Sequence, residues 1–582
     1  MKALIERRRR HATGHSLRLL GVATAVCIAC LAWARPSAAA ERSPVDTAVA
    51  SVIARADWIV HFRPIDHGDR LALARLYTGT SGALLWVAQG KPTAAALAVL
   101  ARLRAADDFG LIPRDYAGET IAALALPGGG APTESNLRRA QFDVSLSAAA
   151  LLLITDLHYG RVDARAAGFE LDARRDALDL VALVRALAQG SDAQRLLSGI
   201  EPQFYHYKLL ESALARYREL ARAAPRLTRL APLGRRSVRP GERYAGAPQL
   251  RELLTALGDL PARAHAPVTD KAAAQVLDPE LLAGLRRFQL RHGLAADGVL
   301  GTATMRELTT PFAWRVRQIE LTLERWRWLP VFKTPPIIVN IPQFRLFAFR
   351  STADRAADIL QMDVIVGRTY PRNRTPVFVA DMRYVIFRPY WDVPRSITMR
   401  EMLPAIESKP GFMEHEHLEI VRGETDAARA LAVTPETLRE LAAGAVRLRQ
   451  RPGPDNALGL IKFVLPNAHD VYLHSTPAQR LFGEARRAFS HGCIRVSDPV
   501  ALAAYVLRDT PGEWTADSIQ AAMNGSETRR VRLAHPIKVM ILYGTVLATE
   551  AGQVMFFEDL YGQDRALERL LGLSAVPRPA AP

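Results

Sequence analysis

The chain has 582 residues, of which 49% are hydrophobic and 23% are charged. At roughly 100–200 residues per domain, this length predicts several folded units. The composition excludes a polytopic membrane protein and a wholly disordered chain. The formal net charge of +17 suits an anionic partner such as nucleic acid, anionic lipid or an acidic polymer. Only three cysteines are present, Cys27, Cys30 and Cys493, so the body of the protein cannot hold a disulfide framework.

The first 40 residues have the order of a secretory signal peptide. A basic run starts at Arg7, residues 19–34 are apolar, and the small residues 38–40 provide a cleavage site. We therefore expect export to the periplasm, where the protein meets no nucleic acid. Contact with the membrane is expected only if the segment stays uncleaved as an anchor. Cleavage would leave Cys493 as the single thiol of the mature chain.

The rest of the chain is expected to form a multidomain α+β protein. Residues 41–235 carry Ala/Leu-rich stripes with charged faces and predict a helical scaffold domain. Residues 236–312 combine a Pro/Gly/Arg-rich linker with a compact helical module. Residues 313–550 are expected to form a β-rich domain, because from about residue 335 the sequence changes to short, branched and aromatic runs with a period of two. Residues 551–582 are a C-terminal extension whose last residues, from Ala575, predict a disordered tail.

The small module carries a recognisable pattern. Leu281, Leu285 and Phe288 share one helical face, and Gly293 is placed to end that helix. The stretch FQLRHGLAADGVLGTATMREL resembles the three-helix peptidoglycan-binding module, which has FQ…GL…DGxxGxxT at this spacing. The alternative is an ordinary helical spacer.

The β-rich domain is interrupted by a charged, helical-looking stretch, residues 396–457. This stretch begins just after the segment WDVP, which contains Trp391. The β-rich sequence resumes shortly before a strand that ends at His474. Because both ends lie close in sequence to the chemistry described next, we expect a helical insertion that caps the pocket.

The chemistry is expected around the last cysteine. The segment DVYLHSTP is followed, after a loop, by SHGCIRV. A thiol becomes a nucleophile when a neighbouring imidazole takes its proton, so Cys493 is the candidate nucleophile and His474 the candidate base. Gly492 allows close backbone approach, and N–H groups near it and Cys493 could form an oxyanion hole. The Ser475 carbonyl is the expected acceptor for the second ring nitrogen of His474.

Other interpretations of these residues remain open. A lone cysteine is often a small buried hydrophobic residue, and in an exported protein it can also pair with another chain. A zinc site built from His469, His474, His491 and Cys493 is the metal alternative, although no pair has metal-ligand spacing.

Residues from about Val339 to Leu547 resemble the catalytic domain of the L,D-transpeptidase (YkuD-type) family, and the whole arrangement resembles its large periplasmic branch. The family motif, a histidine followed by Ser/Thr-His-Gly-Cys, falls on five positions of this chain: His474, Ser490, His491, Gly492 and Cys493. The resemblance implies that Cys493 is the nucleophile and His474 the base. It also suggests Tyr472, Trp391 and Arg495 as substrate-binding residues. Many members have Asn where this chain has Arg495, and His491 is not constant in that branch.

The resemblance implies acyl transfer without metal or other cofactor. The Cys493 thiolate would attack a tetrapeptide stem of peptidoglycan, expel the terminal D-Ala, and pass the acyl group to a second stem as a 3→3 cross-link. The implied partners are peptidoglycan stem peptides and glycan, and carbapenem β-lactams as acylating inhibitors. The alternatives are an L,D-carboxypeptidase or other hydrolase on the same scaffold, and a non-catalytic wall-binding scaffold.

Overall fold

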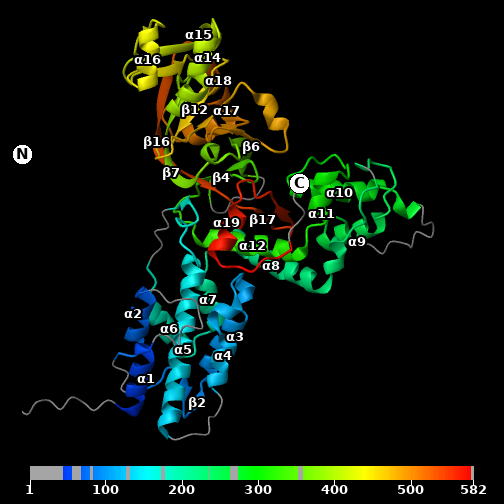
Figure 1. Cartoon of the computed structure of the whole chain (residues 1–582), viewed down its shortest axis with the longest axis vertical. Helices are drawn as coiled ribbons and strands as arrows, with labels where there is room; N and C mark the ends of the chain where they lie inside the picture. The colour runs from blue at the N-terminus through cyan, green and yellow to red at the C-terminus, as the bar shows by residue number, and fades with distance from the viewer. Residues whose placement is uncertain are drawn as a thin grey trace, which may run out of the picture.

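The computed structural model describes residues 43–55, 67–78, 83–125, 132–171, 177–234, 236–262, 273–351 and 358–577. The expected signal segment, residues 1–40, and the end of the expected tail, residues 578–582, lie outside these ranges. Figure 1 shows a helical region at one end of an elongated molecule and a β-rich region at the other, with a small helical module beside the junction between them.

The N-terminal region is helical, as predicted. Its helices are α1 (Pro44–Ala54), α2 (His67–Leu76), α3 (Ala94–Arg104), α4 (Gly118–Leu124), α5 (Pro132–Tyr159), α6 (Leu180–Ala188), α7 (Ala193–Ile200) and α8 (Tyr205–Ala223), with a small hairpin of β1 (Val87–Ala88) and β2 (Lys91–Pro92). Apolar residues from α1 to α7 form one separate hydrophobic core. Helix α8 instead packs along α12 (Phe312–Arg327) and joins the core of the β-rich region.

Helix α5 is the central helix of this bundle. In the part of the chain that the structure describes, it is the one helix long and apolar enough to cross a membrane, and 89% of its apolar window is buried inside the fold. Asp143 of this helix is itself buried, and its carboxylate accepts hydrogen bonds from Tyr77 Oη at 2.7 Å and from the backbone N–H of Trp86 at 2.7 Å. The helix is apolar because the other helices surround it.

The module contains α9 (Ala247–Leu257), α10 (Pro279–Arg291) and α11 (Thr302–Leu308). The prediction for its core is confirmed, since Leu281, Leu285 and Phe288 are all at most 1% exposed. The FQ…DG…T pattern has a structural reason. The buried amide of Gln289 accepts from the Gly298 N–H at 2.9 Å and donates to the Val299 carbonyl at 3.0 Å, which fixes the turn between the two helices.

The module is docked onto the β-rich region rather than tethered to it. Arg291 donates to the Val554 carbonyl at 2.8 Å and forms a buried ion pair with Asp259, with Nη2 and Oδ2 2.5 Å apart. The adjacent His292 ring stacks between Phe288, 3.8 Å away, and Phe556, 5.8 Å away. Contacts at the C-terminal end of α10 therefore fix the position of the module on the β-rich region.

Replacing Asp259 with Ala should destabilise the protein by about 3–5 kcal/mol, because the guanidinium of Arg291 would stay buried without its carboxylate. The measurement is the free energy of unfolding in urea. Glu280→Ala is the matched control, since Glu280 makes a more exposed ion pair with Arg251 and should cost no more than about 1 kcal/mol. Equal losses for the two variants would contradict this account of the docking.

The β-rich region is built on one large sheet with the order β12-β13-β15-β6-β5-β4-β16-β7-β3, with β14 paired to β6. Strand β12 also pairs with β7, so the path closes into a ring. The strands are β3 (Phe169–Glu170), β4 (Ile337–Asn340), β5 (Arg345–Ala348), β6 (Leu360–Gly367), β7 (Val377–Phe387), β12 (Ile461–Val464), β13 (Leu473–His474), β14 (Ala488–Ser490), β15 (Ile494–Val496) and β16 (Arg529–Leu542). These strands confirm the predicted β-rich domain and the α+β class.

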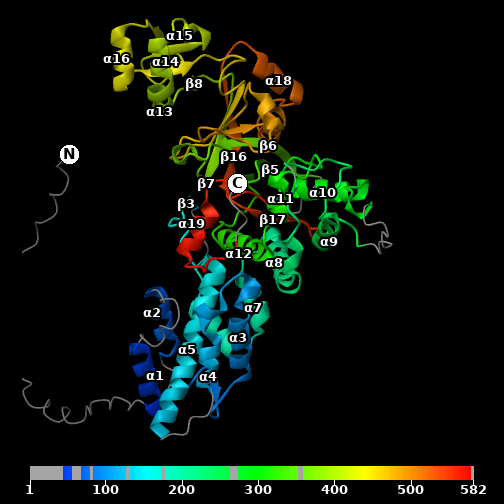
Figure 2. The same ribbon diagram turned by 45° about the vertical axis from the view of Figure 1, so that its right-hand side comes forward.

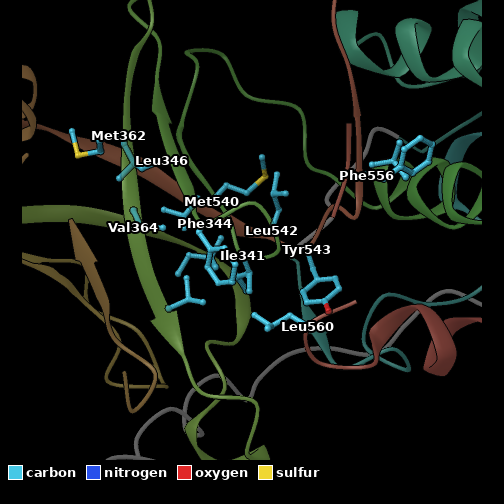
Figure 3. Packing of buried hydrophobic residues seen from close by; sticks show 14 of the residues in the cluster. Ile341, Phe344, Leu346, Met362, Val364, Met540, Leu542, Tyr543, Phe556 and Leu560 are labelled. Carbon is cyan, nitrogen blue, oxygen red and sulfur yellow. The ribbon is translucent and has the colours of Figure 1, made fainter. Parts of the chain in front are cut away.

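The interior of this sheet is filled by alternate residues of its strands, because successive side chains in a strand point to opposite faces. Figure 3 shows side chains of β5, β6 and β16 meeting in one apolar cluster, among them Leu346, Met362, Val364, Met540 and Leu542. Helices α17 (Pro499–Leu507) and α18 (Ala516–Asn524) contribute further buried residues to the same core.

The C-terminal part packs against α12, at the junction between the helical and the β-rich regions. Strands β17 (Val546–Ala548) and β18 (Val554–Phe556) pair with each other, and α19 (Gln563–Leu570) packs against α12. Asp564 of α19 and Arg325 of α12 form a buried ion pair at 2.6 Å. The described residues of the expected C-terminal extension therefore include ordered elements of the core.

The insertion departs from the expectation that it is helical. The insertion begins within α13 (Arg395–Ile397) and contains a π-helical turn (Thr398–Met402), α14 (Leu403–Ser408), α15 (Phe412–His415) and α16 (Pro435–Ala443). It also contains β9 (Leu418–Val421), β10 (Ala430–Leu431) and β11 (Arg447–Gln450), which pair with β8 (Trp391–Asp392), a strand just before the insertion, in the sheet order β10-β9-β11-β8. Leu418, Ile420 and Leu448 point into a core of its own. The charged residues between them hide this period-two pattern in the sequence.

Candidate active site

The candidate residues lie on one face of three neighbouring strands. Strand β13 pairs with β12 so that His474 lies opposite Lys462, and with β15 so that His474 lies opposite Arg495. Since alternate residues of a strand share a face, Tyr472 joins His474 and Cys493 joins Arg495 on that face. The Tyr472 and His474 rings are 5.7 Å apart, and Lys462 Nζ lies 3.9 Å from the centre of the Tyr472 ring.

Cys493 is carried by a tight loop between β14 and β15. The buried Ser490 Oγ donates to the Cys493 carbonyl at 2.6 Å and accepts from the Gly492 N–H at 3.1 Å. Thr375 Oγ1 donates to the Gly492 carbonyl at 2.7 Å from the facing loop. Gly492 has φ = +128°, which a residue with a side chain rarely adopts, so glycine is required at this position.

This loop corrects one prediction about the oxyanion hole. The Gly492 N–H is already used by Ser490 Oγ, so it is not available to a reacting oxygen. The Cys493 N–H has no hydrogen-bond partner within the described residues, so it is the backbone donor left at this position. Ser490 is therefore a residue that shapes the loop.

The thiol of Cys493 is half-buried, and its surroundings favour the protonated form. Sγ donates to the Asp470 carbonyl, with the two atoms 3.7 Å apart. Burial raises the pKa of Cys493, while the N–H and hydroxyl of Tyr472 and the charge of Lys462 oppose that rise by stabilising the thiolate. In the described part of the chain, no hydrogen bond joins the thiol to His474.

His474 is buried and neutral at physiological pH. Burial lowers its pKa, the charge of Arg495 lowers it further, and the Ser475 carbonyl opposes the shift, which leaves a value of about 3. Nδ1 lies 2.6 Å from the Ser475 carbonyl. A carbonyl only accepts, so Nδ1 carries the hydrogen and Nε2 keeps the lone pair of a base. The Ser475 carbonyl thus contacts a ring nitrogen of His474, the contact that the sequence suggested.

Two cations face the thiol. Arg495 is largely buried and its Nε has no hydrogen-bond partner within the described residues. Burial first, and the neighbouring charge of Arg368 second, lower the pKa of Arg495. Burial also lowers the pKa of Lys462, although the Cys493 thiolate would raise it. Sequence reasoning missed Lys462, and its signal was a single charged residue within the apolar strand LIKFVL.

Two residues contact the candidate residues at the edge of the site: Trp391, just before the insertion, and Glu401, within it. A hydrogen bond from Trp391 to the Tyr472 hydroxyl favours the ionised form of that tyrosine, against the burial and the thiolate charge that raise its pKa. His491 Nε2 lies 2.9 Å from Glu401 Oε1 of the insertion, and the His491 side chain is 31% exposed. His491 therefore faces the insertion rather than the thiol.

The residues of the zinc alternative do not come together. His469 pairs with Glu170 at 3.0 Å, His491 pairs with Glu401, and the described residues contain no group of three side chains suited to hold a metal ion. The remaining two, His474 and Cys493, lie on the face described above.

The electrostatics predict how the thiol reacts with pH. Because burial raises the pKa of Cys493 and His474 stays neutral, alkylation by iodoacetamide should accelerate by about tenfold per pH unit up to the thiol pKa. The rate is followed by mass spectrometry of the peptide that contains Cys493. A rate that is level between pH 6 and 8 would show a resting thiolate–imidazolium pair and contradict this prediction.

Three parts of the chain match known protein families. Residues 335–513 match the family described as "L,D-transpeptidase catalytic domain", residues 245–308 match "Putative peptidoglycan binding domain", and residues 71–214 match "Scaffold domain". A Haemophilus influenzae protein named "Putative L,D-transpeptidase" is 28% identical over 251 residues, which are 43% of this chain. The chain spans about half the length of that relative, 49%.

Proposed function

Because the chain contains an L,D-transpeptidase catalytic domain and a peptidoglycan-binding domain, we propose that it forms 3→3 cross-links between peptidoglycan stem peptides through a thioester on Cys493. The domains indicate an enzyme of transpeptidase type that works in the cell envelope. Export through residues 1–40 and a periplasmic location belong to the proposal.

The observation that carries the proposal is the face shared by Cys493, His474, Tyr472, Lys462 and Arg495. It combines a half-buried thiol, a neutral imidazole and two cations. Such a set can activate a nucleophile and hold a negatively charged substrate. A protein that only binds the wall needs neither the thiol nor the imidazole.

In the first step, Nε2 of His474 takes the thiol proton and Sγ attacks the carbonyl carbon at the L-centre of the third stem residue. The Cys493 N–H stabilises the oxyanion that forms. The bond from that carbon to the nitrogen of the terminal D-Ala then breaks, and the leaving amine takes the proton from His474. The product of this step is a thioester, with no metal, ATP or other cofactor involved.

In the second step, the side-chain amine of another stem attacks the thioester carbonyl and loses its proton to His474. The C–S bond breaks, the new amide is the cross-link, and the thiolate recovers the proton from the imidazolium. Carbapenems present a strained carbonyl to the same thiolate, so we expect them to acylate Cys493.

Arg495 is proposed to bind a carboxylate of the donor stem. Its buried guanidinium has an Nε without a partner within the described residues, and burying such a group is costly until an anion pairs with it. Replacing it with Gln should lower kcat/KM by about 10- to 100-fold, the loss expected for one hydrogen bond to a charged group. The comparison uses stems whose carboxylate is free or amidated. An equal loss for both substrates would contradict the carboxylate role.

The decisive experiment is mass spectrometry of the products that the purified protein makes from disaccharide-tetrapeptide. Cross-linked dimers support the transferase. Tripeptide alone at high acceptor concentration would replace it with an L,D-carboxypeptidase, since water and an amine attack the same thioester. Absence of both products, with an intact fold, would leave a wall-binding protein.

A further inference from the structure

We propose that Glu170 of the helical region is a positioning residue for the nucleophile, because through His469 it holds the turn 467–471 whose Asp470 carbonyl accepts a hydrogen bond from the thiol. This inference rests on the proposed role of Cys493. It gives the helical region a direct effect on the reaction, beyond support for the fold.

The helical region reaches the catalytic sheet through strand β3. This strand pairs with the first residues of β7 in parallel, with Phe169 opposite Val377 and Glu170 opposite Phe378 (Figure 2). Phe169 is 2% exposed and meets the ring of Trp328 at 5.5 Å. The backbone of Glu170 is therefore fixed on the catalytic region, although its side chain is largely exposed.

His469 connects this carboxylate to a turn of the catalytic region. Its Nε2 lies 3.0 Å from Glu170 Oε2, and its ring lies 5.1 Å from that of Phe378. Asn467 holds the turn from inside, because its side chain accepts from the N–H groups of His469 and Val471 and donates to the Val471 carbonyl. The turn is thus anchored at its ends by Asn467 and at its tip by the helical region.

Asp470, the residue after His469, adopts a left-handed conformation with φ = +54°. Such a conformation is uncommon outside glycine and persists where the surroundings enforce it. It directs the Asp470 carbonyl to Cys493 Sγ, 3.7 Å away. In this arrangement the thiol donates a hydrogen bond to the Asp470 carbonyl, and no hydrogen bond in the described residues joins the thiol to His474.

Tyr472, by contrast, is held independently of the tip of the turn. Its carbonyl accepts from the Ile494 N–H at 3.1 Å, and its ring packs under Lys462. The groups that stabilise the thiolate, Tyr472 and Lys462, should therefore stay in place when the tip is released. What should move away is Asp470, whose carbonyl accepts a hydrogen bond from the neutral thiol and whose carboxylate charge raises the pKa of Cys493. Arg495, the other charge that faces the thiol, lies on β15 and is unaffected.

The contact between Glu170 and His469 can be removed without damage to the core. Glu170 and His469 line an open cavity of about 340 Å³ together with Asp381 and Lys538, which form an ion pair of their own at 2.9 Å. An ion pair with an exposed carboxylate contributes little to stability. Loss of the Glu170 side chain should therefore leave the thermal unfolding midpoint within a few degrees of the parent.

The test measures the rate of Cys493 alkylation against pH in the full chain, again by peptide mass spectrometry. Glu170→Ala and His469→Ala should each shift the profile to lower pH and raise the rate near pH 7 about threefold to tenfold, as expected when one weak hydrogen bond to the thiol is lost. The double variant should match the single ones, because both residues act through one contact. Glu170→Gln should stay near the parent, since its amide oxygen can accept from Nε2 of His469.

Lys538→Ala is the matched control, since it breaks an ion pair at the same cavity without contact to the turn. Its profile should coincide with that of the parent. An unchanged profile for Glu170→Ala, a shift to higher pH, or an equal shift for Lys538→Ala would overturn the proposal. Because alkylation needs no stem peptide, this outcome is independent of whether cross-linked products form.

Discussion

Replacing Cys493 with Ala is expected to abolish cross-link formation and acylation by a carbapenem. Covalent catalysis needs the thiolate, and the loss of a nucleophile lowers kcat by a factor on the order of 10⁶. Dimer formation and the mass of the acylated protein are both followed by mass spectrometry. The fold should persist, because Ser490 and Thr375 bind the backbone of the loop rather than the thiol.

Cys493→Ser provides the second variant for this prediction. A serine side chain is similar in size to that of cysteine and carries an O–H in place of the S–H. Its hydroxyl is a far weaker nucleophile without strong activation. We expect no dimers from either variant and unchanged thermal unfolding for both. Dimers formed by Cys493→Ala would refute the whole mechanism.

Replacing His474 with Ala should lower the rate of acylation near pH 7 by a factor on the order of 10²–10⁴, the usual contribution of a general base. In the proposed mechanism the neutral Nε2 of His474 is the proton acceptor, since Nδ1 is engaged by the Ser475 carbonyl. The rate should recover partly at high pH, where the thiolate forms unaided. The measurement is the carbapenem acylation rate between pH 6 and 10.

Two further variants separate the base from the packing at this position. His474→Gln keeps most of the volume of the buried ring and should lose as much rate as His474→Ala. His491→Ala should lose little, because His491 is partly exposed and pairs with Glu401 of the insertion. If His491→Ala instead shows the large loss and the pH recovery, His491 is the base.

Much of the organisation could be predicted from the sequence, because the signals are local. The helix face of Leu281, Leu285 and Phe288 and the strand segments of the β-rich region follow from periodicity alone. The sheet inside the insertion was not predicted. There the buried positions Leu418, Ile420 and Leu448 alternate with charged residues over strands of only four residues. So short a pattern gives little period-two signal against the stronger helical signal of α16.

At the site, the sequence by itself determined which residues are the candidates for the chemistry. One short segment contains both the spacing of His474 and Cys493 and Gly492, whose φ only glycine readily adopts. Tertiary structure decided what surrounds them. Lys462 and Arg495 come together only because three strands pair in one register, and Glu170 reaches His469 from 299 positions away. A strand register and a domain contact depend on packing between distant segments, so no local pattern encodes them.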